Sequence, residues 1–154
     1  MVLLYSYTLE FITQKDHLRR GVLFLISEDR RVTAKTVFDG LDEDTKRMFQ
    51  TRFDYWLSGK PYSRGYHGWN KSEFQGKYTN CFVFTGREER LAKRLYGFLC
   101  NPKASDHRYH VCILIRYARK TKNETDETDL KIVEEIRTLS AVQKAIADYF
   151  KEKS

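Results

Sequence analysis

The chain of 154 residues is long enough to bury one hydrophobic core and too short for two ordinary domains, so a single domain spanning residues 1–154 is predicted. Its net charge of +7 favours polyanions or an acidic protein as partners without choosing between them. Its three dispersed cysteines do not suggest a disulfide framework, and no leader or membrane-length apolar run is present, so a cytoplasmic protein without a membrane partner is predicted.

The first part of the chain predicts a strand followed by two helices. Residues 5–11 show some alternation and form a candidate edge strand within an N-terminal extension, residues 1–20. Residues 21–27 form a short apolar run that is typical of a buried strand. A short helix is expected near residues 33–41. The clearest helix follows from residue 42, with apolar side chains at helical spacing up to Leu57, and Gly59 and Pro61 end it.

The second part predicts three antiparallel strands and a final helix. Residues 62–80 lack a sustained period and are expected to form a long loop with at most one short strand. Strands are expected at residues 81–84, 90–100 and 109–118, and a helix at about residues 129–153. The sequence therefore predicts an α+β fold, in which an antiparallel or mixed sheet packs against N-terminal helices and a C-terminal helix is added.

Positive charge is concentrated in the predicted strands. The segment from Arg87 to Lys122 holds ten cations against three anions, which equals the net charge of the whole chain. Strand alternation places Arg94, Tyr96 and Phe98 on one face of the sheet. In the last strand, Ile113 is expected on the core side and Arg116 on the other. The face opposite the helices should then present arginines beside aromatic rings, which suits the phosphates and unstacked bases of single-stranded RNA.

A simpler interpretation of the same residues is structural. Arg94 and Arg116 would pair with carboxylates such as Glu73, Glu88 or those of "NETDETD", residues 123–129, while Tyr96 and Phe98 pack under a loop. The stretch around His67 has the spacing of a GxxG clamp but not its helical flanks. No Cys or His spacing suits a metal, and no cofactor motif is found, so neither a metal nor a cofactor is predicted.

Two stretches carry a resemblance to a known family. "RLYGFLC" and "HVCILIRYARKTKNETDE" resemble the last two strands and the basic tail of the RelE/ParE toxin superfamily, particularly its HigB-like, phage-derived branch. The order of predicted elements within residues 21–126 is similar as well. The resemblance implies a RelE-like fold and the toxin of a type II toxin-antitoxin system. Such a toxin is a metal-independent endoribonuclease that cuts messenger RNA, often on the ribosome, and pairs with an antitoxin protein.

The resemblance also implies roles for individual residues. Arg94 matches the strand arginine of the family and Lys120 the basic residue beyond the last strand, and both are expected to be catalytic. The family often has a catalytic Tyr or His shortly after this turn, where the present chain has none. Tyr117 or Asp126 could substitute, although alternation directs Tyr117 toward the core. Expected nucleic-acid contacts are Arg87, Arg90, Lys93, Tyr96, Arg116, Arg119 and Lys122.

Two alternative functions stay open at this point. The missing aromatic residue favours a non-catalytic module that binds nucleic acid or another protein. The long final helix favours a ParE-like inhibitor of DNA gyrase.

Overall fold

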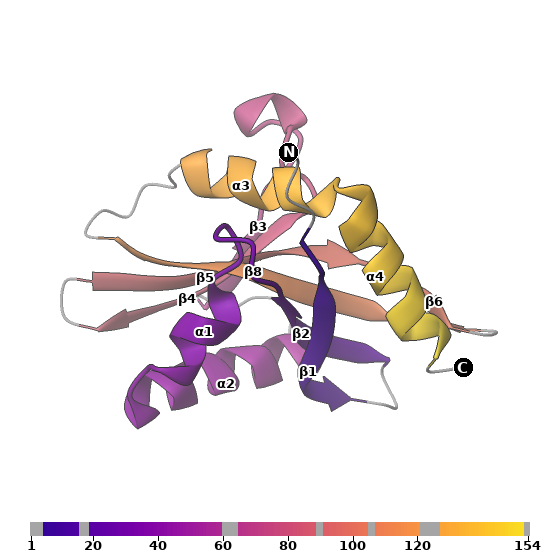
Figure 1. Cartoon of the computed structure of the whole chain (residues 1–154). Coiled ribbons are helices and arrows are strands. Elements are labelled where there is room, and N and C mark those ends of the chain that lie inside the picture. The colour runs from indigo at the N-terminus through magenta and orange to yellow at the C-terminus, as the bar shows by residue number, and fades with distance from the viewer. Residues whose placement is uncertain are drawn as a thin grey trace.

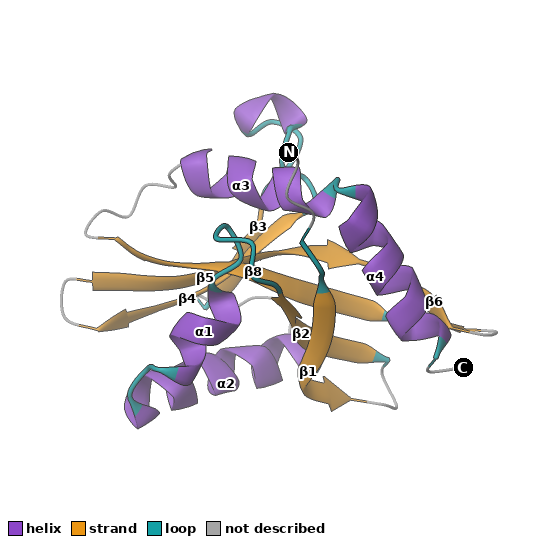
Figure 2. Cartoon of the chain, viewed as in Figure 1, coloured by secondary structure: helices purple, strands orange, loops and turns teal. Residues whose placement is uncertain are grey.

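The computed structural model describes residues 5–15, 19–59, 65–88, 91–104, 107–120 and 127–152. It has an α+β fold in which a mixed six-stranded sheet lies between two layers of helices (Figures 1 and 2). The strands follow the spatial order β1-β2-β8-β5-β4-β3. Their bounds are Thr8–Lys15 for β1, Arg20–Ile26 for β2, Tyr66–Gly68 for β3, Cys81–Glu88 for β4, Leu91–Cys100 for β5 and His110–Lys120 for β8.

The sheet is antiparallel except for one interior pair, in which β2 runs parallel to β8. Side chains of β2 alternate between the two helix layers, and Val22 and Leu23 are both fully buried. A strand covered on both faces needs apolar residues at successive positions, which explains the continuous apolar run in the sequence. A two-stranded ribbon of β6, Lys103–Ala104, and β7, His107–Arg108, lies beside the main sheet.

One face of the sheet is covered by α1, Ala34–Asp39, and α2, Glu43–Leu57. The predicted apolar stripe of α2 is confirmed, because Phe49, Phe53 and Leu57 are fully buried. The ring of Phe53 meets Phe84 edge-on at a centroid distance of 4.8 Å. Phe49 and Phe53 stack within the same aromatic cluster.

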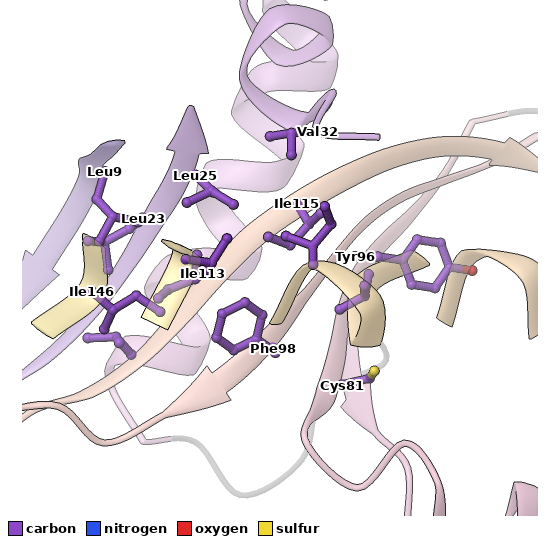
Figure 3. Close-up of a cluster of buried hydrophobic side chains, with 14 of the residues drawn as sticks. Leu9, Leu23, Leu25, Val32, Cys81, Tyr96, Phe98, Ile113, Ile115 and Ile146 are labelled. Atoms are coloured by element: carbon purple, nitrogen blue, oxygen red, sulfur yellow. The ribbon is translucent and has the colours of Figure 1, made fainter. Parts of the chain in front are cut away.

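The other face is covered by α3, Glu127–Arg137, and α4, Ser140–Lys151 (Figure 1). Figure 3 shows Ile146 of α4 among side chains from β1, β2 and β8. Two expectations are thereby corrected. The sheet face opposite the N-terminal helices is covered by helices, and the C-terminal region contains two helices instead of one. Leu139 separates them because its backbone is extended, with φ −64° and ψ 131°.

A bulge in β8 changes the strand alternation on which the face assignments depended. Tyr96 pairs with Arg116, but Gly97 pairs with Leu114, so Ile115 is the extra residue. A Cβ at Gly97 would lie 2.1 Å from the carbonyl oxygen of Ile113, so glycine permits this close approach. Phe98 and Ile113 consequently share the α3/α4 face, whereas the sequence interpretation placed them on opposite faces. Beyond the bulge, Arg116 lies on that same face.

The described parts of the N-terminal extension and of the expected loop also contain regular structure. The N-terminal extension contributes β1, which pairs antiparallel with β2, and the expected loop contains β3 and a 3-10 turn at Phe74–Gly76. No helix in the described part of the chain combines the length and apolar character required to cross a membrane.

Candidate nucleic-acid site

A cavity of about 500 Å³ lies over β4 and β5 on the α3/α4 face of the sheet, beside β3, and one side chain of α2 reaches it. Basic and aromatic side chains dominate its lining, and no Asp or Glu from the described residues contributes to it. The lining residues are Arg52, His67, Trp69, Val83, Thr85, Gly86, Arg87, Ala92, Arg94 and Tyr96. Such a lining favours an anionic ligand that also carries a planar, partly apolar group.

Strand register brings the predicted cations to this cavity. Arg94 pairs with Thr85 and Ala92 pairs with Arg87, so side chains of β4 and β5 meet on one face. A guanidinium nitrogen of Arg94 donates to the hydroxyl of Tyr96 at 3.2 Å, and Arg94 is only 7% exposed. One cavity is therefore lined by three of the residues predicted to contact RNA or act in catalysis, Arg87, Arg94 and Tyr96.

Arg52 reaches the cavity from α2, and the sequence analysis missed it. Its Nε donates to the carbonyl oxygen of Thr85 at 3.3 Å. The side chain passes over Gly65, where a Cβ would lie 1.9 Å from the Arg52 Cδ. The helical spacing of apolar residues in α2 identifies only the buried stripe of that helix. Nothing in the sequence therefore indicated that Arg52 contacts β4.

His67 lies at the mouth of the cavity and was likewise missed. It stands opposite Val83 in the β3–β4 register, and its exposed ring packs beside Trp69 at a centroid distance of 4.9 Å. Desolvation by the surrounding side chains lowers the pKa of His67, and the charge of Arg94 lowers it further, while Glu73 acts in the opposite direction. The imidazole is therefore held neutral at pH 7.

A buried ion-pair cluster lies on the same face, at the end of β8. Asp129 in the first turn of α3 is 2% exposed and accepts from Arg116 Nε at 2.7 Å. Lys120 Nζ lies 3.0 Å from the other carboxylate oxygen. The structural alternative is thus confirmed for Arg116, because Asp129 belongs to the "NETDETD" segment. The predicted catalytic Lys120 shares that carboxylate.

Tyr96 links the cavity to this ion-pair cluster. Burial raises the pKa of Tyr96. The hydrogen bond from Arg94 and the charges of Arg94 and Lys120 lower this pKa, whereas the charge of Asp129 raises it. Its ring is 1% exposed and stacks on Trp69, with centroids 6.3 Å apart. The expectation that Tyr96 would pack under a loop is therefore also confirmed, although its hydroxyl is directed to Arg94.

Three of the predicted site residues lie on the opposite face of the sheet. Lys93, Tyr117 and Arg119 line a second cavity of about 400 Å³ between β5, β8 and the N-terminal helices. Lys93 Nζ donates to the hydroxyl of Thr45 at 2.9 Å. Tyr117 packs edge-on against Phe49, as its predicted direction toward the core implied. These three residues therefore do not meet Arg94.

Two of the predicted contacts, Arg90 and Lys122, lie outside the described residues, as does Asp126. Within the described ranges, His, Cys, Asp and Glu side chains do not gather in a group of three that would hold a metal ion. Burial raises the pKa of both the Cys81 and Cys100 thiols to about 12, so neither is a reactive thiolate at neutral pH.

The cavity combines groups for two chemical tasks. Arg52, Arg87 and Arg94 are suited to stabilising charge on a phosphate, and a neutral His67 is suited to accepting a proton. Searches against protein-family models, curated proteins and solved structures found no match to this chain.

Proposed function

We propose that this protein is the toxin of a type II toxin-antitoxin system and cleaves messenger RNA without a metal ion, at the cavity around Arg94. The observation that carries the proposal is the convergence of Arg52, Arg87 and Arg94 with His67 and Tyr96 around one cavity. RNA supplies its own nucleophile, the ribose 2′-hydroxyl. The protein therefore has to orient the strand, move protons and stabilise charge on the phosphate.

The order of elements supports this proposal. A strand, β2, two helices, α1 and α2, and the long strands β4, β5 and β8 occur in the order that the resemblance to RelE-like toxins implies, with the short strands β3, β6 and β7 between them. Arg94 occupies the middle of that arrangement and contributes to the cavity, as a catalytic strand arginine would. A cytoplasmic site of action and an acidic antitoxin that covers the basic lining belong to the same proposal.

Arg94→Ala tests the nuclease proposal. The wild-type protein should arrest growth when its expression is induced and should create new messenger RNA ends. Purified protein should cleave messenger RNA, either free or on ribosomes. Loss of one charge-stabilising donor is expected to slow cleavage by about 10²–10³-fold. Arg47→Ala is the matched control because Arg47 is an exposed arginine on α2 that pairs with Asp44.

Other outcomes separate the alternative functions. Growth arrest with intact messenger RNA would contradict the nuclease proposal and direct the search to DNA gyrase. If neither growth arrest nor cleavage occurs, with or without ribosomes, the nuclease proposal is wrong.

A non-catalytic RNA-binding protein is the second candidate, and one observation favours it. Asp129 contacts both Arg116 and Lys120, so one predicted RNA contact and one predicted catalytic cation are already paired with a carboxylate. This candidate predicts salt-dependent binding of single-stranded RNA that is weakened by Arg94→Ala, with the RNA left intact.

A further inference from the structure

The proton acceptor for RNA cleavage has to be a group that is unprotonated at neutral pH, accessible and close to the arginines of the cavity, and no described Asp or Glu lines that cavity. The tyrosines do not meet these conditions. Tyr96 is 1% exposed and has a raised pKa, and Tyr117 packs against Phe49 on the other side of the sheet. Lys120 forms an ion pair with Asp129 at 3.0 Å and does not line the cavity.

His67 meets all three conditions. It belongs to β3, the edge strand of the sheet, and its ring is exposed at the mouth of the cavity. Packing against Trp69 holds the ring in place while leaving it accessible to a ligand. A substrate phosphate held by the arginines would thus lie next to an imidazole.

The charges around His67 favour its neutral form. Arg94 of β5 lowers its pKa, and Arg52 of α2 and Arg87 of β4 line the same cavity. Glu73, in the loop that precedes the 3-10 turn, is the opposing carboxylate. Desolvation, the largest contribution, also acts against protonation.

We propose that His67 is the catalytic group that accepts the proton of the ribose 2′-hydroxyl, an assignment that rests on the proposed nuclease function. The 2′-oxygen forms a bond to phosphorus while the bond from phosphorus to the 5′-oxygen breaks. Water at the open mouth gives a proton to the departing 5′-oxygen, and the resulting hydroxide recovers the proton from His67. The products are a 2′,3′-cyclic phosphate and a 5′-hydroxyl, and the protein is unchanged.

The test compares His67→Gln with the wild-type protein under single-turnover conditions. Cleavage should be at least about 100-fold slower in the variant, the lower range for loss of a general base. Binding should change less than twofold, measured by fluorescence anisotropy with an RNA whose scissile nucleotide is 2′-deoxy and cannot be cut. This separation distinguishes a lost proton acceptor from a lost binding contact.

The pH dependence supplies a second readout. Only the neutral imidazole accepts a proton, and its pKa lies below the ordinary value of 6.5. The wild-type rate should therefore rise with pH through a midpoint below 6.5 and then level off, and His67→Gln should lose this rise. His110→Gln is the matched control, because His110 also has a lowered pKa but lies at the start of β8, where it contacts Asn101.

The possible failures can be told apart. If His67→Gln cleaves within threefold of the wild-type rate while Arg94→Ala is inactive, the nuclease function stands and the assignment of His67 is wrong. A slow variant that keeps the wild-type pH profile would also overturn the assignment. If the wild-type protein cleaves no RNA with or without ribosomes, both proposals are wrong. Because the His67 ring is exposed, the variant should fold, which circular dichroism verifies.

Discussion

The two faces of the sheet differ in whether they bury charged side chains. The α1/α2 face is sealed by aromatic rings, among them Phe49, Phe53 and Phe84. The buried charged side chains among the described residues, Asp29, Arg94 and Asp129, all lie on the α3/α4 side. Burying a charge is costly unless it is paired, and Asp29 and Asp129 are each paired with an arginine. The contrast separates an aromatic core on the α1/α2 face from the buried charges on the α3/α4 side, where the proposed site lies.

Removing a ring from the α1/α2 face should have the largest effect on stability. Phe53→Ala is expected to lower the free energy of unfolding by about 3–5 kcal/mol, because it empties a fully buried site between Phe49 and Phe84. Urea unfolding measures the loss. The fraction that remains folded should cleave RNA at the wild-type rate. Lost activity in folded protein would contradict the division between the two faces.

Lowering the pH should destabilise the fold by protonating Asp29, on the α3/α4 side. Hydrogen bonds from Arg31, with the backbone N–H of Arg31 and the hydroxyl of Tyr7 contributing, lower the pKa of Asp29 from 3.8 to about 2. Because the folded-state pKa is the lower one, this contribution to stability is complete above pH 3.8 and is lost as pH falls through about 2. It corresponds to about 2 kcal/mol.

Asp29→Asn isolates this contribution from those of other carboxylates. Between pH 5 and pH 2, the wild-type protein should lose about 2 kcal/mol more unfolding free energy than Asp29→Asn, as measured by urea unfolding. Equal losses in the two proteins would show that the Asp29 cluster does not stabilise the fold.

The smallest effect is expected from a cation on the α1/α2 side. Lys93 neighbours Arg94 in sequence but points to the opposite face, where it contacts Thr45. Arg94→Ala should weaken binding of a 2′-deoxy RNA at least tenfold, about 1.4 kcal/mol, and Lys93→Ala less than threefold. Fluorescence anisotropy at one fixed salt concentration makes the comparison. Equal effects would mean that RNA also contacts the α1/α2 face.

Local patterns in the sequence predicted much of the fold. The stripe of α2 and the apolar run of β2 are set by residues close together in the chain, so their spacing identified a helix and a strand. The bulge was not predictable in this way. It depends on Gly97 meeting the backbone of Ile113, a contact between two strands whose register only the folded sheet defines.

The candidate site was predicted only in part for the same reason. Arg94 and Arg87 were identified because charge is concentrated in that segment and strand alternation brings charged side chains to one face. Arg52 and His67 come from a helix and an edge strand that are distant from β5 in the sequence. Their meeting is a property of tertiary structure, and the sequence drew attention to His67 only through the glycines that flank it.

The parallel pairing of β2 with β8 has a consequence for synthesis of the chain. β2 begins at Arg20, whereas its partner β8 begins at His110, so about 90 residues are translated between them. At typical translation rates of about 5–20 residues per second, the edge of β2 that pairs with β8 stays unpaired for several seconds after β2 is synthesised. β5, which carries Arg94, also lacks its neighbour β8 until late in translation. A nascent chain released before β8 should therefore be inactive and prone to aggregate.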